Sequence, residues 1–134
     1  MTKSSFDYYD KNGQVELWLA YKTLQKPEET ILNILSDELN DMKMLDVGIG
    51  AGRTTPYFGT KVREYFGIEI SRNLIEASKN RYWEDGKNLL FLHCDARTMP
   101  LPTNYFDLVL FSFNGIDHVN INGRLQMLKE INRV

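Results

Sequence analysis

Glycine or acidic residues follow three apolar segments of this chain in turn. The first segment is followed by the cluster Gly48-Ile49-Gly50-Ala51-Gly52, the second ends at Glu69 and the third is followed by Asp95. Glycines let the backbone approach a ligand closely and turn sharply. Carboxylates accept hydrogen bonds from hydroxyl and amino groups. Brought to one place, these groups would bind a nucleoside through its hydroxyls and its base.

The glycine cluster stands between a strand-like segment, 44–47, and a helical segment that runs from 53 to about 58. In such a corner the N–H groups that open the helix point toward the space where a ligand binds. The candidate binding residues of this corner are Gly48, Ile49, Gly50 and Gly52. A plain tight turn, without a ligand, is the alternative.

Acidic residues at the next two strand ends would recognise the sugar and the base. Glu69 follows Gly48 by 21 residues, close to the spacing of about 20 at which an acidic side chain accepts hydrogen bonds from ribose hydroxyls. Ile70 would then lie against a purine ring. Asp95 would accept a hydrogen bond from an adenine amino group, and the N–H of Ala96 would meet a ring nitrogen. A solvated glutamate is the alternative for Glu69.

Several acid–base groups occur together only after the fourth apolar segment, 107–113. His118 is the candidate catalytic residue there, because an imidazole can move a proton near neutral pH. Asp117 beside it is a second candidate. A helix cap for Asp117 and simple packing for His118 are the alternatives. No metal-ligand spacing occurs in the sequence, so we expect no metal site.

The elements that must position these groups alternate along the chain. Apolar runs predict four strands and helical periodicity predicts helices between them. The strands are expected at 44–47, 65–70, 89–92 and 107–113, and the helices from 27, 53, 73 and 121 onward. This alternation favours right-handed βαβ units and an α/β, Rossmann-like, doubly wound parallel sheet. Such a sheet binds ligands at the carboxyl ends of its strands.

The composition narrows the class of protein. The 134 residues are enough for one domain, and their net charge of −2, with scattered Lys and Arg, supplies no basic stripe for a nucleic acid. The sequence lacks the roughly 20 consecutive apolar residues of a membrane span, so we expect no membrane partner. The single cysteine, Cys94, favours a reducing, cytoplasmic location.

Four motifs in a fixed order resemble a known family, and the resemblance covers about residues 30 to 134. The segment 44–55, an acid followed by G-x-G-x-G, resembles the first motif of class I S-adenosylmethionine-dependent methyltransferases. Segments 65–71, 94–96 and 106–110 resemble the family's second, third and fourth motifs. Segment 128–134 resembles the helix that precedes the family's leucine-lysine-proline-glycine-glycine turn. The resemblance implies S-adenosylmethionine (SAM) as cofactor and methyl transfer by in-line displacement.

The resemblance also assigns roles to single residues. Gly48, Gly50 and their neighbours would line the methionine part of the cofactor. Asp46 would lie near the methionine amino group, as would the carbonyl of Phe111 or Ser112. A lid of about residues 1–26 would cover a core of about 27–134, and its aromatic faces could stabilise the sulfonium. The aromatic residues concerned are Tyr8, Tyr9, Trp18 and Tyr21, for which packing of an N-terminal helix is an equal alternative.

The family's complete sheet has seven strands in the order 3-2-1-4-5-7-6, whereas this sequence supplies about four. We therefore expect an incomplete, truncated domain with an N-terminal helical segment. Strand 107–113 would then have an exposed edge, and such edges seek partners. A homodimer through this edge is the expected partner arrangement.

The acceptor of the methyl group is less defined than the cofactor. Neither N/D-P-P-Y/F nor Pro-Cys follows the fourth strand, which argues against a base nitrogen or a cytosine carbon and leaves a small molecule. Two other functions stay open. One is a nicotinamide dehydrogenase, which is disfavoured because its fingerprint is G-x-G-x-x-G, whereas the third glycine here, Gly52, comes one residue earlier. The other is a non-catalytic cofactor-binding fragment that needs a partner or a C-terminal half.

Overall fold

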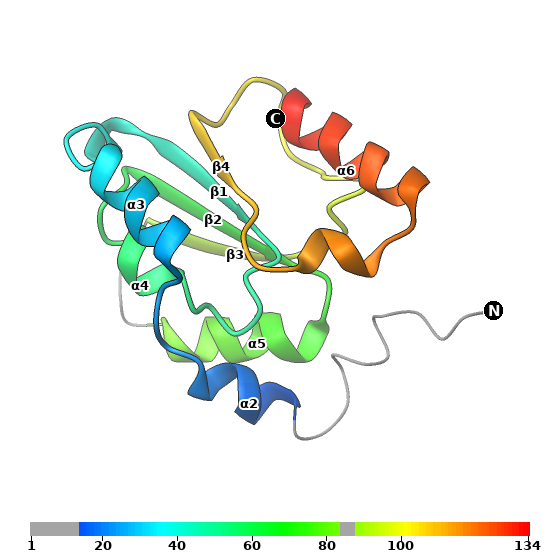
Figure 1. The fold of residues 1–134 in the computed structure, drawn as a ribbon, viewed down its shortest axis with the longest axis horizontal. Coiled ribbons are helices and arrows are strands. Elements are labelled where there is room, and N and C mark those ends of the chain that lie inside the picture. Colours follow the sequence, from blue (N-terminus) through cyan, green and yellow to red (C-terminus); the bar gives the residue numbers. More distant parts are fainter. Residues whose placement is uncertain (1–13, 84–87) are drawn as a thin grey trace.

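A sheet of four parallel strands forms the centre of the computed structural model, which describes residues 14–83 and 88–134. Its strands are β1 (Lys43–Val47), β2 (Glu64–Glu69), β3 (Leu89–His93) and β4 (Leu108–Leu110). They lie in the order β3-β2-β1-β4 (Figure 1). The chain moves outward from β1 to β3 and then returns to the other side of β1. The strand order therefore reverses at β1, and the predicted incomplete Rossmann-like sheet is confirmed.

Helices cover both faces of the sheet, as Figure 1 shows. They are α2 (Gln14–Ala20), α3 (Lys26–Ile34), α4 (Thr55–Phe58), α5 (Arg72–Arg81) and α6 (Ile121–Arg133), with short 3₁₀ turns η1 (Leu39–Asp41) and η2 (Gly115–His118). Successive strand residues face opposite ways. Leu45 therefore packs in the cluster that includes Met127 of α6, and Met44 packs in the cluster that includes Phe58 of α4.

The structure differs from the sequence prediction at two elements that border the glycine corner. The fourth strand is only Leu108–Leu110 instead of 107–113, and Phe113 has a φ of 64° that no strand residue adopts. The helix predicted from 53 begins at Thr55 and has a single turn. These shorter elements leave longer loops at the carboxyl ends of β1 and β4.

The N-terminal segment contains the helix α2, which contacts α5. Of the aromatic residues predicted to cover the site, Trp18 lies in this helix and Tyr21 directly follows it, whereas Tyr8 and Tyr9 lie outside the described residues. The division into a lid of about 1–26 and a core of about 27–134 stays a prediction. Within 14–83 and 88–134, no helix has the length and apolarity that a membrane span requires.

Candidate cofactor site

A cavity of about 560 Å³ opens at the carboxyl ends of the strands. This volume lies within the range of small-molecule and cofactor pockets. Most of the residues that the sequence predicted for the site line it, whereas Gly52 and Asp117 do not. The predicted residues in the lining include Asp46, Gly48, Ile49, Gly50, Glu69, Ile70, Asp95, Ala96, Phe111 and His118. The topology thus brings together groups that lie far apart in the sequence.

The corner after β1 depends on glycine because its backbone is left-handed at alternate positions. Gly48, Gly50 and Gly52 have φ of 69°, 59° and 78°, a region that disfavours residues with a Cβ. Gly52 points away from the cavity lining. A Cβ there would come within 2.5 Å of the ring of Tyr82, whose hydroxyl donates to the Gly52 carbonyl at 2.7 Å. Gly52 therefore packs the corner against the end of α5.

The N–H groups of the corner are used within the protein. Gly48 N and Ile49 N donate to the Ile68 carbonyl at 2.8 and 3.2 Å, and Gly50 N donates to Glu69 Oε2 at 2.9 Å. The helix that follows is shorter than predicted, because α4 has one turn and begins only at Thr55. That its N–H groups face a ligand stays a prediction. Close approach of the backbone is what this corner offers.

Glu69 links the end of β2 to the glycine corner. Its Oε2 accepts from Gly50 N, and its Oε1 accepts from the N–H groups of Ile70 and Ser71, each at 2.9 Å. The residue is 7% exposed. Three backbone donors therefore hold one carboxylate, in one orientation, at the wall of the cavity.

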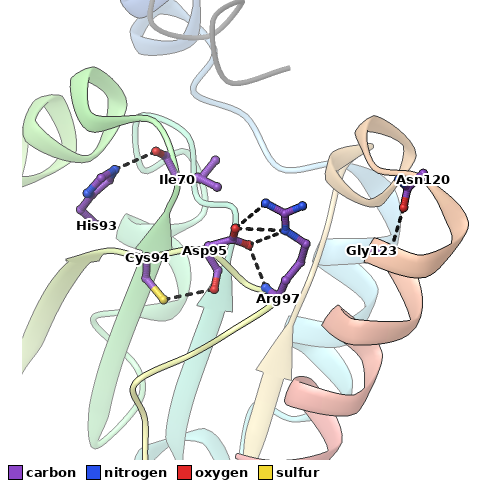
Figure 2. A network of polar contacts seen from close by, with 7 residues as sticks. All are labelled: Ile70, His93, Cys94, Asp95, Arg97, Asn120 and Gly123. Atoms are coloured by element: carbon purple, nitrogen blue, oxygen red, sulfur yellow. Dashed lines mark hydrogen bonds and ion pairs between the residues drawn. The ribbon is translucent and has the colours of Figure 1, made fainter. Parts of the chain in front are cut away.

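Asp95 is held by a neighbour that the sequence reading did not single out. The side chain of Arg97 approaches the carboxylate as a fork, with Nη2 2.6 Å from Oδ2 and Nε 3.0 Å from each oxygen, and Arg97 N donates to Oδ1 at 2.9 Å (Figure 2). Burial would raise the pKa of Asp95, but these hydrogen bonds hold it below its ordinary value. Asp95 is thus an ionised group in the lining.

Asp46 is a buried acid, and within 14–83 and 88–134 no Lys, Arg or His forms an ion pair with it. Its Oδ2 accepts from Thr54 Oγ1 at 2.5 Å and from the Tyr65 hydroxyl at 2.8 Å. Burial raises the pKa of Asp46 to about 6, and the two hydrogen bonds only partly oppose it. A cation that entered the cavity beside this carboxyl would favour its ionised form.

A buried ion pair joins the glycine corner to the N-terminal segment. Arg53 donates to both oxygens of Glu28, at 2.6 and 2.5 Å, and to the Thr23 carbonyl at 3.0 Å. Burial would raise the pKa of Glu28, but hydrogen bonds from Arg53, Ser112 and the Gln25 N–H lower it. The pair therefore ties together α3, the corner after β1 and the exit of β4.

Three aromatic rings gather beside this pair. The ring of Phe113 stands edge-on to Trp18 and Tyr21, with centroids 5.6 and 5.8 Å away, and the Arg53 guanidinium lies 5.2 Å from its centroid. The ring of Trp18 would be 3.6 Å from a Cβ on Gly50. We name Trp18, Tyr21 and Phe113 the aromatic cover. All three line the cavity.

The acid–base candidates occupy different places. His118, at the end of η2, is exposed and lines the cavity. Asp117 does not line it, and its carboxylate lies 3.8 Å from Arg124. The His93 ring lies 2.8 Å from the Ile70 carbonyl (Figure 2). Burial raises the pKa of Cys94 to about 11, which keeps this cavity-lining thiol protonated at neutral pH.

The residues that the sequence reading missed are Glu28, Arg53, Arg97 and Phe113. Glu28 and Arg53 carry opposite charges, but their separation of 25 positions follows no local spacing rule. Arg97 had a usable signal, because it stands two residues after an acid in a loop. The left-handed backbone at Phe113 could not be predicted from the sequence, because phenylalanine rarely adopts this conformation.

Comparison with known proteins agrees with this geometry. Residues 44–134, more than half of the chain, match the model of the methyltransferase domain family. The chain belongs to this methyltransferase family. The predicted resemblance to class I S-adenosylmethionine-dependent methyltransferases is therefore confirmed at the level of the family.

Individual relatives of this methyltransferase domain are longer than the chain itself. This chain is 32% identical over 129 residues to the demethylmenaquinone methyltransferase of Staphylococcus saprophyticus. The match covers 94% of this chain and 52% of the relative. The domain thus spans about half the length of that protein.

Solved structures share the fold. A SAM-dependent methyltransferase from Aquifex aeolicus is 24% identical with a TM-score of 0.68, over 97% of this chain and 65% of that one. The magnesium protoporphyrin IX methyltransferase of Synechocystis PCC 6803, solved with bound SAM, is 14% identical with a TM-score of 0.74 and covers 95% of this chain and 68% of its own. At these identities the likeness is one of fold.

Proposed function

We propose that the cavity binds SAM and that the domain takes part in methyl transfer to a small-molecule acceptor. The observation that carries the proposal is the meeting of the glycine corner with two acidic strand ends in one cavity. Glu69 contacts the corner directly, at Gly50 N, and Asp95 lines the same space from β3. This arrangement suits an adenosine, with Glu69 at the ribose hydroxyls and Asp95 at the adenine amino group.

The remaining lining residues fit the methionine half of SAM. Gly48 and Gly50 allow close approach of the methionine chain, and Asp46 would attract its ammonium group. Phe111 and Ser112 stand across the cavity at the exit of β4, where a backbone carbonyl could accept from the same ammonium. Gly52 would act indirectly in this scheme, by packing the corner against Tyr82.

The reaction would be an in-line displacement. SAM would supply an activated methyl group, which the acceptor's nucleophile would take while the carbon–sulfur bond breaks and neutral S-adenosylhomocysteine (SAH) leaves. Here the protein's contribution is alignment, exclusion of water and a proton acceptor where the nucleophile carries a proton. His118 is the proposed proton acceptor because it is the imidazole in the cavity lining. The aromatic cover would face the positive sulfonium.

A direct test is transfer of labelled methyl from SAM to a panel of small acceptors. The panel should include a quinol with the head group of demethylmenaquinone, which the Staphylococcus relative is named for. We expect labelled product with at least one acceptor and slower turnover for His118→Asn. SAH binding without any labelled product would instead support the alternative of a non-catalytic cofactor-binding fragment.

The edge of β4 is the proposed site of self-association. Among the described strands, β4 pairs with β1 alone, and an unpaired strand edge offers N–H and C=O groups to another chain. Light scattering is expected to give the mass of a dimer. A monomer at tens of micromolar would contradict this arrangement.

A further inference from the structure

Arg97 lies in the cavity lining beside Asp95, at the place where the proposed function puts the adenine base. We propose that Arg97 is a positioning residue that makes this site select a 6-amino purine over a 6-oxo purine. The proposal rests on the proposed function, because it takes the adenosine of SAM or SAH as the ligand. Arg97 would act through Asp95, which it contacts directly, and not on the reacting atoms.

Four hydrogen bonds from Arg97 fix the Asp95 carboxylate. The Arg97 guanidinium meets both carboxylate oxygens, and the Arg97 backbone N–H meets Oδ1 from the other direction. A planar fork of this kind sets the plane of the carboxylate as well as its charge, which a lysine ammonium could not do. Asp95 therefore faces the cavity as an oriented group that only accepts hydrogen bonds.

The arginine stem lies beside α6. Its Cδ is 3.5 Å from where a Cβ on Gly123 would stand, an ordinary van der Waals distance. The first turn of α6 is fixed by Asn120, whose side chain accepts from Gly123 N at 2.9 Å (Figure 2). Arg97 thus holds Asp95, and the stem of Arg97 lies next to the first turn of α6.

Selectivity follows from the chemistry of the base. The 6-amino group of adenine donates to an ionised carboxylate, whereas the 6-oxo group of hypoxanthine places an acceptor against an acceptor. A carboxylate that is not pinned can rotate away, or take a proton and donate to the oxo group. Loss of Arg97 would therefore reduce the preference for adenine, in addition to any loss of affinity.

The experiment is calorimetric titration of wild type, Arg97→Met and Arg97→Lys with SAH and with S-inosylhomocysteine, its 6-oxo analogue, between pH 5 and 8. Arg124→Met is the matched control, because Arg124 pairs with Asp117 and does not line the cavity. Wild type and the control are expected to prefer SAH by roughly 10- to 100-fold at every pH.

The ratio of the two dissociation constants is the readout, because a merely structural role would weaken both ligands alike. We expect Arg97→Met to lower this ratio by roughly tenfold, with the larger loss at the acidic end of the range, because burial then favours the neutral form of an Asp95 carboxyl that has lost its cation. The ratio for Arg97→Lys should fall between the ratios for wild type and Arg97→Met. An unchanged ratio with SAH still bound would overturn the role of Arg97 alone. Failure of wild type to bind SAH would overturn the proposed function with it.

Discussion

The Arg53 guanidinium donates to both carboxylate oxygens of Glu28, at 2.6 and 2.5 Å, with the side chains only 6% and 3% exposed. Replacing Arg53 with Met would leave the Glu28 carboxylate buried without its cation. Removal of one partner of a buried pair costs about 3–5 kcal/mol, so we expect the free energy of unfolding, measured in urea, to fall by that amount.

The control lies in α3, the helix that carries Glu28. Glu29 pairs with Lys26 at the surface, with side chains 48% and 87% exposed, and Glu29→Gln is expected to cost no more than about 0.5 kcal/mol. The double variant Glu28→Leu, Arg53→Met should recover part of the loss, because it leaves no buried charge. Equal losses for Arg53→Met and Glu29→Gln would contradict this role of the pair.

The stability of the fold should depend on pH through Asp46. Burial raises its pKa from 3.8 to about 6 in the folded chain, so the folded state holds the proton more tightly than the unfolded state. The resulting stability is fully present below about pH 4 and is lost as pH rises to about 6. A shift of this size is worth about 3 kcal/mol.

Asp46→Asn removes this titration. The difference in unfolding free energy between variant and wild type is expected to grow in favour of the variant by up to about 3 kcal/mol from pH 4 to pH 7. Urea unfolding at several pH values measures it, and exposed Asp37→Asn is the control. Parallel curves for Asp46→Asn and wild type would refute the elevated pKa.

Two glycines of the corner should respond differently to alanine. Gly48→Ala meets only the Phe111 ring at 3.5 Å, whereas Gly52→Ala comes within 2.5 Å of the Tyr82 ring. Both variants are strained by positive φ, at about 1–2 kcal/mol, and Gly52→Ala adds overpacking of about 1–3 kcal/mol. The free energy of unfolding in urea should therefore be lower for Gly52→Ala than for Gly48→Ala. Equal values would contradict the packing role of Gly52.

The aromatic cover should slow the escape of a bound cofactor. Trp18 stands over Gly50, so Trp18→Ala is expected to raise the dissociation rate of SAH roughly tenfold through lost aromatic contact. Stopped-flow displacement measures this rate. Trp83, which is 81% exposed, supplies the control Trp83→Ala. The same rate for both variants would show that Trp18 does not cover the ligand.

The sequence predicts those parts of the architecture that depend on short, local residue patterns. The four strands follow from short apolar runs, and their carboxyl ends carry Glu69 and Asp95 in both prediction and structure. Because the strands are parallel, their carboxyl ends lie at the same end of the sheet. The local pattern and the parallel arrangement that it implies were sufficient to predict this part of the cavity lining.

The remainder depends on contacts between distant segments. The sequence offers no rule that pairs Glu28 with Arg53, and its apolar run through Phe113 predicts a longer strand than Leu108–Leu110. The left-handed backbone at Phe113 ends that run and turns the ring toward Trp18. Such a conformation is imposed by the assembled fold, so it becomes visible only in three dimensions.

The central claim, that Glu69 and the glycine corner hold the adenosine of SAM, is tested most directly by calorimetric titration with SAH and with NAD. Wild type is expected to bind SAH and to give no heat of binding with NAD. Glu69→Gln should weaken SAH by roughly 10- to 100-fold, while Glu76→Gln on the exposed side of α5 should not. Binding of NAD in place of SAH, or equal SAH affinity for Glu69→Gln and wild type, would contradict the claim.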